Sequence, residues 1–421
     1  MAIGPNSSAE PISTSHPPAV FAGFSSWLLD AFDYFLMTFT LTSMAREFHK
    51  TDAEMALMIT MTMLCRPVGG FLFGLLADRY GRKKPLMVNM SAYALAGILT
   101  GLAPSYTSLL VIRGIFGIVM GGTWGVGTSM AMEAAPAKRR GLLSVVLQEG
   151  YAAGNVLAAA LFFFLHGLGW RWLFILSSLP AIPLVVYIGL AVRESEVWKR
   201  VSSSAIPPKA QKQERAVGGA PGGWSVQFTD IARSWKLFAY LLVFMTMMMF
   251  ASHGTQDMYP TFLQRAWNMG PSQRSLITAI SGLGAIAGGI VVGHFSDKLG
   301  RRVAIVGAFV LGILVIPLWA YAPNMWLLVA GAVLIQFAVQ GAWGVIPAHL
   351  AELTPDTVRA TLPGFAYQCG GVLASGIGAL EALFAARTSY PTAMALIAVS
   401  VFVLAGTMAA VGREKRGTEF G

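Results

Sequence analysis

Charged residues are scarce in this sequence. Asp, Glu, Lys and Arg together make up 12% of its 421 residues, whereas a soluble domain carries about 25%. The deficit runs along the whole chain, while hydrophobic residues reach 55% and the mean hydropathy is +0.61. This composition excludes an ordinary soluble protein and indicates an integral membrane protein that crosses the bilayer many times.

Cysteine is equally sparse, and common catalytic motifs are missing. Cys65 and Cys369 both fall inside apolar segments, so we expect no disulfide framework. The sequence contains no HExxH, GxSxG or P-loop pattern, which argues against an enzyme, and we expect no cofactor and no metal site. The first 20 residues contain no Lys or Arg, so they lack the basic start of a cleaved signal peptide, and the first helix is expected to be retained.

Apolar segments of about 20 residues, the length that a helix needs to cross a bilayer, recur throughout the chain. They are continuous and do not alternate with polar residues, which argues against the strands of a membrane barrel. We expect twelve membrane-spanning helices, near residues 20–45, 55–77, 84–103, 107–132, 141–166, 170–192, 235–263, 273–297, 303–321, 325–350, 358–385 and 390–412.

Basic residues are unevenly divided between the two sides of this arrangement. Twelve spans put both ends of the chain on one side, and the loops there, with the C-terminal tail, hold 22 of the 30 Lys and Arg. The bias predicts a protein of the inner (plasma) membrane with both termini in the cytoplasm. The net charge of +10 is therefore explained by membrane orientation, and it does not indicate nucleic-acid binding. We expect a cytoplasmic N-terminal tail (1–19), a first six-helix bundle (20–192) and a cytoplasmic linker (193–234) that could hold a membrane-surface helix. A second six-helix bundle (235–412) and a cytoplasmic C-terminal tail (413–421) follow.

An internal repeat relates the two halves. GGFLFGLLADRYGRK, from Gly69, matches GGIVVGHFSDKLGRR, from Gly288, at an offset of 219 positions. The same ungapped offset relates Trp124 to Trp343 and holds over about 70 residues. Six helices in each half give the two copies the same orientation, which is the parallel repeat of one class of transporters.

The repeated GxxxDxxGRK motif resembles the signature of the major facilitator superfamily, and the resemblance covers the whole chain. SHGTQDMYPT in the seventh span resembles the helix-7 signature of yeast-type lactate permeases in the sialate:proton symporter family; DAFDYF, CRPVGG and RGIFGIVMGG fit the same group. The resemblance implies an all-α integral membrane protein with the major facilitator fold and two parallel six-helix repeats. Glu149 departs from the glutamine expected in this family.

The function that this resemblance implies is proton-coupled uptake of monocarboxylates or of larger carboxylated sugars. We expect a monomeric symporter of small monocarboxylates, lactate first, that works by alternating access; its partners would be a small organic anion, a proton and the lipid bilayer. One alternative is a proton symporter of sialate or another bulky organic acid. An alternative of another class is a nutrient sensor that has the same fold and no longer transports.

Charges inside the spans mark the candidate site, because each costs roughly 2.5–3.5 kcal/mol at a helix centre. Asp33 and Arg66 reach a similar depth and are predicted to pair. Arg113 has no charged counterpart in the second half, and its guanidinium fork is predicted to bind the substrate carboxylate. The other expected substrate-binding residues are Gln368, Asp33, Tyr34, Trp124, Glu149 and Gln256.

The seventh span carries a candidate proton site. His253 and Asp257 are four residues apart and share one helix face, and Pro260 is expected to break the helix there. Histidine titrates near neutral pH and a neighbouring carboxylate tunes it, so this pair, together with Asp33, is predicted to couple protons to transport. The alternative is a helix end that simply emerges into extracellular water.

Charged residues in the repeated motifs gather at the cytoplasmic helix ends. Such a cluster can form ion pairs that hold this face closed and break when it opens; the alternative is that the charges only shape the loops. The predicted gating residues are Asp78, Arg82, Glu133, Arg140, Asp297, Arg301, Glu352 and Arg359.

Overall fold

The structure, a computed structural model, describes residues 16–204 and 223–420, and these are helical apart from short connections. The first half comprises α1 (His16–Glu47), α2 (Asp52–Tyr80), α3 (Lys83–Gly101), α4 (Tyr106–Ala134), α5 (Arg140–Gln148), α6 (Gly150–Leu165), α7 (Trp170–Ser178) and α8 (Ala181–Ala191). The second half comprises α12 (Trp235–Gln256), α13 (Tyr259–Ala266), α14 (Pro271–Leu299), α15 (Arg301–Ala320), α16 (Met325–Leu353), α17 (Thr361–Ala374), α18 (Ile377–Arg387) and α19 (Tyr390–Val411). Between the halves lie α9 (Glu196–Ser204) and α11 (Gly223–Arg233).

Each of the twelve expected spans holds either one helix or two consecutive helices. Ten of the spans in the described chain are long and apolar enough to cross a membrane by themselves. The first helix begins at His16, slightly before the expected boundary. Most of the predicted N-terminal tail and part of the predicted linker, residues 1–15 and 205–222, lie outside the described residues.

The seventh span is broken, as the sequence predicts. The helix α12 ends at Gln256, and α13 begins at Tyr259 with Pro260 in its first turn. Proline has no backbone N–H, so it cannot donate to the carbonyl of Gln256 and continue the helix. The fifth, sixth and eleventh spans are also divided, at Glu149, at Leu179–Pro180 and at Ser375–Gly376. Irregular backbone at membrane depth is tolerated where protein or a cavity surrounds it.

The sequence repeat reappears as a repeat of helix packing. A methyl group on Gly69 of α2 would lie 1.7 Å from the carbonyl oxygen of Ile118 in α4. A methyl group on Gly288 of α14 would lie 2.0 Å from the carbonyl oxygen of Phe337 in α16. Both residues of the second pair lie 219 positions after those of the first. Small residues let the two backbones of each pair come into direct contact, as is usual between membrane helices.

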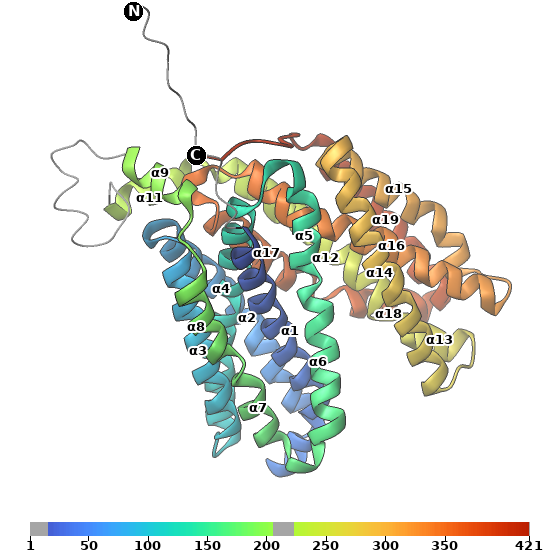
Figure 1. Cartoon of the computed structure of the whole chain (residues 1–421). Helices are drawn as coiled ribbons and strands as arrows, with labels where there is room; N and C mark the ends of the chain where they lie inside the picture. Colours follow the sequence, from blue (N-terminus) through green and yellow to red (C-terminus); the bar gives the residue numbers. More distant parts are fainter. Residues whose placement is uncertain (1–15, 205–222, 421) are drawn as a thin grey trace, which may run out of the picture.

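The two halves form separate bundles that contact each other mainly through α5 and α17. The helix α5 packs against α14 and α16, and α17 packs against α2 and α4. Figure 1 shows the bundle α1–α8 beside the bundle α12–α19, approaching most closely at the end where the C-terminus lies. We call this end the basic face, because the loops after α2, α4, α14 and α16, which carry Lys or Arg residues, lie there. A small apolar cluster that includes Val20, Ala131, Ala348 and Phe420 joins both bundles.

Gly69→Ala is expected to lower the stability of the protein, because the added methyl group would overlap the backbone of α4. Overpacking of a tight contact costs roughly 1–3 kcal/mol. The matched control is Gly307→Ala in α15, where the methyl group would meet no atom within 4 Å. Thermal unfolding of the purified variants in detergent measures the effect; an unfolding midpoint for Gly69→Ala equal to that of Gly307→Ala would contradict the packing.

Candidate functional site

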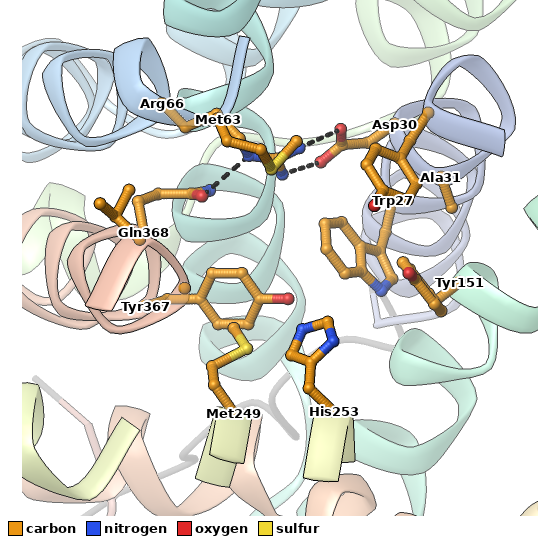
Figure 2. Close-up of a pocket in the computed structure, with 13 residues that line it drawn as sticks. Trp27, Asp30, Ala31, Met63, Arg66, Tyr151, Met249, His253, Tyr367 and Gln368 are labelled. Atoms are coloured by element: carbon orange, nitrogen blue, oxygen red, sulfur yellow. Dashed lines mark hydrogen bonds and ion pairs between the residues drawn. The ribbon is translucent and has the colours of Figure 1, made fainter. Parts of the chain in front are cut away.

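A cavity lies between the two bundles, near the middle of α1 and α2. The first bundle contributes α1, α2 and α6 to its wall, and the second contributes α12 and α17. The cavity is lined by Trp27, Asp30, Ala31, Tyr34, Met63, Arg66, Tyr151, Met249, His253, Tyr367, Gln368, Gly371 and Val372. Figure 2 shows how these side chains converge from helices that are distant in the sequence.

Arg66 is the central charge of this cavity. Its Nη1 and Nη2 donate to the two carboxylate oxygens of Asp30, at 3.2 and 2.8 Å, and its Nε donates to Oε1 of Gln368 at 2.9 Å. The amide nitrogen of Gln368 donates to the carbonyl of Gly121 at 3.1 Å. Figure 2 shows the guanidinium between Asp30 and Gln368, with polar partners from both bundles. A charged group at this depth thus has its hydrogen bonds satisfied, and it bridges the two halves.

The predicted pair of Asp33 with Arg66 is wrong, because the partner of Arg66 is Asp30. Asp30 and Asp33 are three residues apart, a rise of only about 4.5 Å along the helix axis, so an argument from membrane depth cannot separate them. They point to different neighbours, since Asp30 reaches α2 while Asp33 reaches Arg113 of α4.

Arg113 and Asp33 form a second buried ion pair. Nη1 and Nη2 of Arg113 donate to the two carboxylate oxygens of Asp33 at 3.2 and 2.8 Å. The guanidinium also lies 4.3 Å from the centre of the Phe116 ring. Both charged side chains are almost fully buried, and neither lines the described cavity. The fork that was predicted to hold a substrate carboxylate already holds Asp33 in this conformation.

Aromatic side chains form part of the cavity wall. The rings of Tyr367 and Trp124 are stacked with their centres 4.3 Å apart. Trp27 packs edge-on against Tyr367 at 5.8 Å and stacks on Tyr151 at 5.7 Å. This wall offers apolar surface to a ligand that enters the cavity.

The other predicted binding residues are spread more widely. Tyr34 and Gln368 line the cavity, while Trp124 lies behind Tyr367. Gln256 donates to Gln336 of α16 at 2.9 Å instead of lining the cavity. Glu149 was predicted to bind substrate, but it does not line the cavity and lies at the joint between α5 and α6. There its carboxylate lies beside Gly289 of α14.

Three lining aromatic residues and one acid were not predicted as site residues. Trp27 and Tyr151 lie in apolar runs, where an aromatic ring is usually a packing residue. Tyr367 sits next to Gln368 in the sequence, and this adjacency was the available signal. Asp30 could have been found from its spacing to Asp33, because two acids one turn apart in a membrane helix require two partners.

His253 and Asp257 lie together at the break in the seventh span. Nδ1 of His253 is 3.2 Å from a carboxylate oxygen of Asp257, and the two side chains are 41% and 47% exposed. His253 lines the cavity, and Asp257 follows the last residue of α12. Water can therefore reach both side chains, and His253 connects the pair to the cavity.

The structure brings all eight predicted gating residues together at the basic face. Arg82 pairs with Asp78 and Glu133 at 2.7 and 2.8 Å, and Arg301 pairs with Asp297 and Glu352 at 2.7 and 3.0 Å. Two further pairs cross between the bundles: Arg140 with Glu352 at 3.0 Å and Arg359 with Glu133 at 3.4 Å. Their role in opening and closing this face stays a prediction.

Asp78 and Asp297 also cap helices of the opposite bundle. Asp78 accepts hydrogen bonds from the backbone N–H groups of Ala360 and Thr361, at 3.0 and 2.9 Å. Asp297 accepts from those of Gly141 and Leu142, at 2.8 and 3.1 Å. The two arrangements correspond through the repeat offset of 219 positions. A carboxylate at a helix N-terminus satisfies free donors and complements the helix dipole, so each bundle stabilises a helix of the other.

The C-terminal residues lie against this network. The ring centre of Phe420 is 3.8 Å from the guanidinium carbon of Arg140 and 3.7 Å from that of Arg359. The carbonyl of Thr418 accepts a hydrogen bond from Arg140 at 2.9 Å. Because Arg140 and Arg359 belong to different bundles, the tail adds a contact that bridges the closed face.

Comparison with known proteins gives the family. The sequence model described as Major Facilitator Superfamily matches residues 23–256 and 258–419. The chain belongs to this superfamily. The structure of the proton:xylose symporter XylE bound to 6-bromo-6-deoxy-D-glucose superposes with a TM-score of 0.75 at 17% identity, over 97% of this chain and 98% of that chain. The predicted all-α, twelve-helix major facilitator fold is thereby confirmed.

Several relatives in this superfamily are named as transporters of organic acids. The carboxylic acid transporter protein homolog of Saccharomyces cerevisiae is 28% identical over 424 residues, which cover 94% of this chain and 68% of the relative. The sialic acid transporter NanX of Escherichia coli is 27% identical over 363 residues, which cover 84% of each chain. The similarity to such transporters, predicted from the helix-7 motif, is confirmed.

Replacement of either capping carboxylate should loosen a helix in the opposite bundle. In Asp78→Asn the amide hydrogens of Ala360 and Thr361 lose a charged acceptor, and in Asp297→Asn those of Gly141 and Leu142 do. Hydrogen bonds to charged groups contribute about 1.5–3 kcal/mol, so we expect hydrogen exchange there to become at least about tenfold faster.

Hydrogen–deuterium exchange with mass spectrometry measures this effect at peptide resolution. The control is Glu196→Gln, which removes a carboxylate that pairs with Lys199 on its own helix. Faster exchange confined to the bundle that carries the substitution would contradict the crossed arrangement of caps.

Proposed function

We propose that this protein is a proton-coupled symporter of small monocarboxylates, with lactate as the first candidate, that works by alternating access. The observation that carries the proposal is Arg66, held at the bundle interface between Asp30 and Gln368 and lining the cavity. An arginine fork can bind a carboxylate through two parallel hydrogen bonds. The organic acid transporters among the relatives support the same substrate class.

Competition for Arg66 gives a physical route to coupling. While Asp30 is ionised, it occupies the fork that a substrate carboxylate would need. A proton on Asp30 removes that competing charge, and the substrate carboxylate then restores charge balance beside Arg66. The proton and the anion therefore bind together more readily than either binds alone. His253, which lines the cavity, and its exposed partner Asp257 would supply the proton.

The ion pairs at the basic face support a conformation in which this face is closed. If the basic face is cytoplasmic, as the Lys and Arg bias indicates, the ion-pair network and the two crossed caps close the cavity on the cytoplasmic side. Substrate and proton then enter from the opposite side. Rocking of the bundles would break the pairs of Arg140 with Glu352 and of Arg359 with Glu133. We further propose a monomer in the inner (plasma) membrane with cytoplasmic termini.

A bulkier organic acid is the second candidate substrate. The aromatic wall formed by Trp27, Tyr151 and Tyr367 could also accept a ring, and NanX is a sialic acid transporter by name. Competition of unlabelled sialate and unlabelled lactate for the same uptake would rank the two candidates.

Arg66→Lys should weaken lactate binding strongly. Lysine keeps the charge but cannot form the two parallel hydrogen bonds of the fork; a loss of about 1.5–3 kcal/mol corresponds to at least a tenfold weaker affinity. The assay is calorimetry or equilibrium binding on purified protein, with Arg387→Lys at the exposed end of α18 as the control. Arg113→Lys in the same assay separates the two arginines: strong loss there with normal binding in Arg66→Lys would return the anion site to Arg113.

Asp257→Asn should abolish uphill lactate accumulation into proteoliposomes driven by an inward proton gradient, because the amide cannot carry the charge change. Exchange of lactate between preloaded compartments needs no net proton movement and should survive. The control is Glu47→Gln, which removes a half-exposed carboxylate that pairs with Arg171. Accumulation by Asp257→Asn at the wild-type level would place the proton site elsewhere.

A further inference from the structure

An acid that no part of the proposed mechanism uses is buried in the second bundle. Glu381 lies in α18, between the joint at Ser375–Gly376 and Arg387 at the end of that helix. It is only 2% exposed, and both of its carboxyl oxygens are buried without a hydrogen-bond partner. Among the residues that the structure describes, it is the one acid in this condition. The other acids buried within the spans, such as Asp30 and Asp33, pair with arginines.

The surroundings of Glu381 are apolar. A methyl group on Gly254 of α12 would lie 3.7 Å from Oε1 of Glu381, and 3.6 Å from side-chain carbons of Ile377 and Ile397. An ionised carboxylate without a partner is very costly in such a place, whereas the neutral acid costs far less. Intramembrane acids of this kind are rare, and they commonly mark proton or substrate pathways. The conformation described here therefore accommodates Glu381 in its protonated form.

The titratable groups near Glu381 lie on the helices that pack against α18, namely α12 and α19. His253 precedes Gly254 on α12, and Asp257 lies directly after the end of that helix, so the exposed pair is next to the buried acid. At the start of α19, Tyr390 lies under the guanidinium of Arg265 from α13, at 5.5 Å. On α18 itself, Arg387 is exposed at the far end. Glu381 thus adjoins an exposed imidazole–carboxylate pair that water can reach.

We propose that Glu381 is a proton-binding site of the transport cycle, loaded from the His253–Asp257 pair. This inference rests on the proposed proton-coupled transport. A proton passes from water to the exposed pair and then to a carboxyl oxygen of Glu381, which is carried as the neutral acid. When α18 moves and water reaches the carboxyl group, the proton leaves to that water. Gly376 and Gly378, which meet no neighbouring atoms within 4 Å of an added methyl group, leave space for that movement.

The test compares Glu381→Gln, Glu381→Asp and wild type in proteoliposomes. Glutamine imitates the neutral acid but cannot release a proton, so Glu381→Gln should retain lactate exchange and lose gradient-driven accumulation. Wild type coupled to one proton should accumulate lactate about tenfold for each pH unit of gradient. Aspartate can still titrate, so Glu381→Asp should keep driven accumulation. Equal driven accumulation by wild type and Glu381→Gln would overturn the proposal.

A second readout separates this inference from the proposed function. The infrared spectrum of purified wild type near neutral pH should contain the carbonyl band of a protonated carboxyl group, and Glu381→Gln should lack it. An unchanged band in Glu381→Gln would overturn the proposal whether or not transport is measured. A different result would be a carbonyl band that is present in wild type and lost in Glu381→Gln, together with wild-type uptake that does not depend on the proton gradient. That result would refute proton coupling and, with it, the transport role of Glu381. The control in both experiments is Glu47→Gln.

Discussion

A charge inside a membrane protein needs a partner, and in this protein the partners lie on other helices. Arg66 of α2 is held by Asp30 of α1 and Gln368 of α17, and Arg113 of α4 is held by Asp33 of α1. Because each pair joins separate helices, satisfying the charges also fixes how those helices pack. The pair of Arg113 lies within one bundle and stabilises it, whereas the contacts of Arg66 reach across the interface. A ligand that changes the partners of Arg66 therefore acts directly on the relative position of the bundles.

The same logic operates at the basic face, where the partners are backbone donors. Asp78 and Asp297 each cap a helix in the opposite bundle, and each is also paired with an arginine of its own bundle. Separation of the bundles would leave these carboxylates with their arginines, while the N-termini of α5 and α17 would turn to water. Asp78 and Asp297 would thus keep an arginine partner after such a separation, whereas Arg140 would lose the carboxylate of Glu352.

The features that could be predicted from the sequence are those that depend on local composition or on the internal repeat. The twelve spans, the break before Pro260 and the gathering of charges at the loops follow from local composition and from one offset. The partner of Arg66 could not be predicted, because Asp30 and Asp33 differ in azimuth around α1 and hardly in depth. The position of Glu149 depends on the joint between α5 and α6, which no local signal marks. Glu381 was not among the predicted site residues, and its burial is evident only once α12 and α19 pack around α18.

The contrast between Glu381 and the other buried acids indicates a division of tasks. An acid bound to an arginine is stabilised as a carboxylate, so a change of its proton must be accompanied by a change at the arginine. A transporter that binds a proton and an anion together requires an acid whose protonation is linked to an arginine. Asp30 is paired with Arg66 and meets this requirement. The protonation of an acid without a partner depends instead on whether water reaches it, since only solvation stabilises its ionised form. A cycle that moves α18 between apolar and wet surroundings could therefore load and unload Glu381 without any change at Arg66.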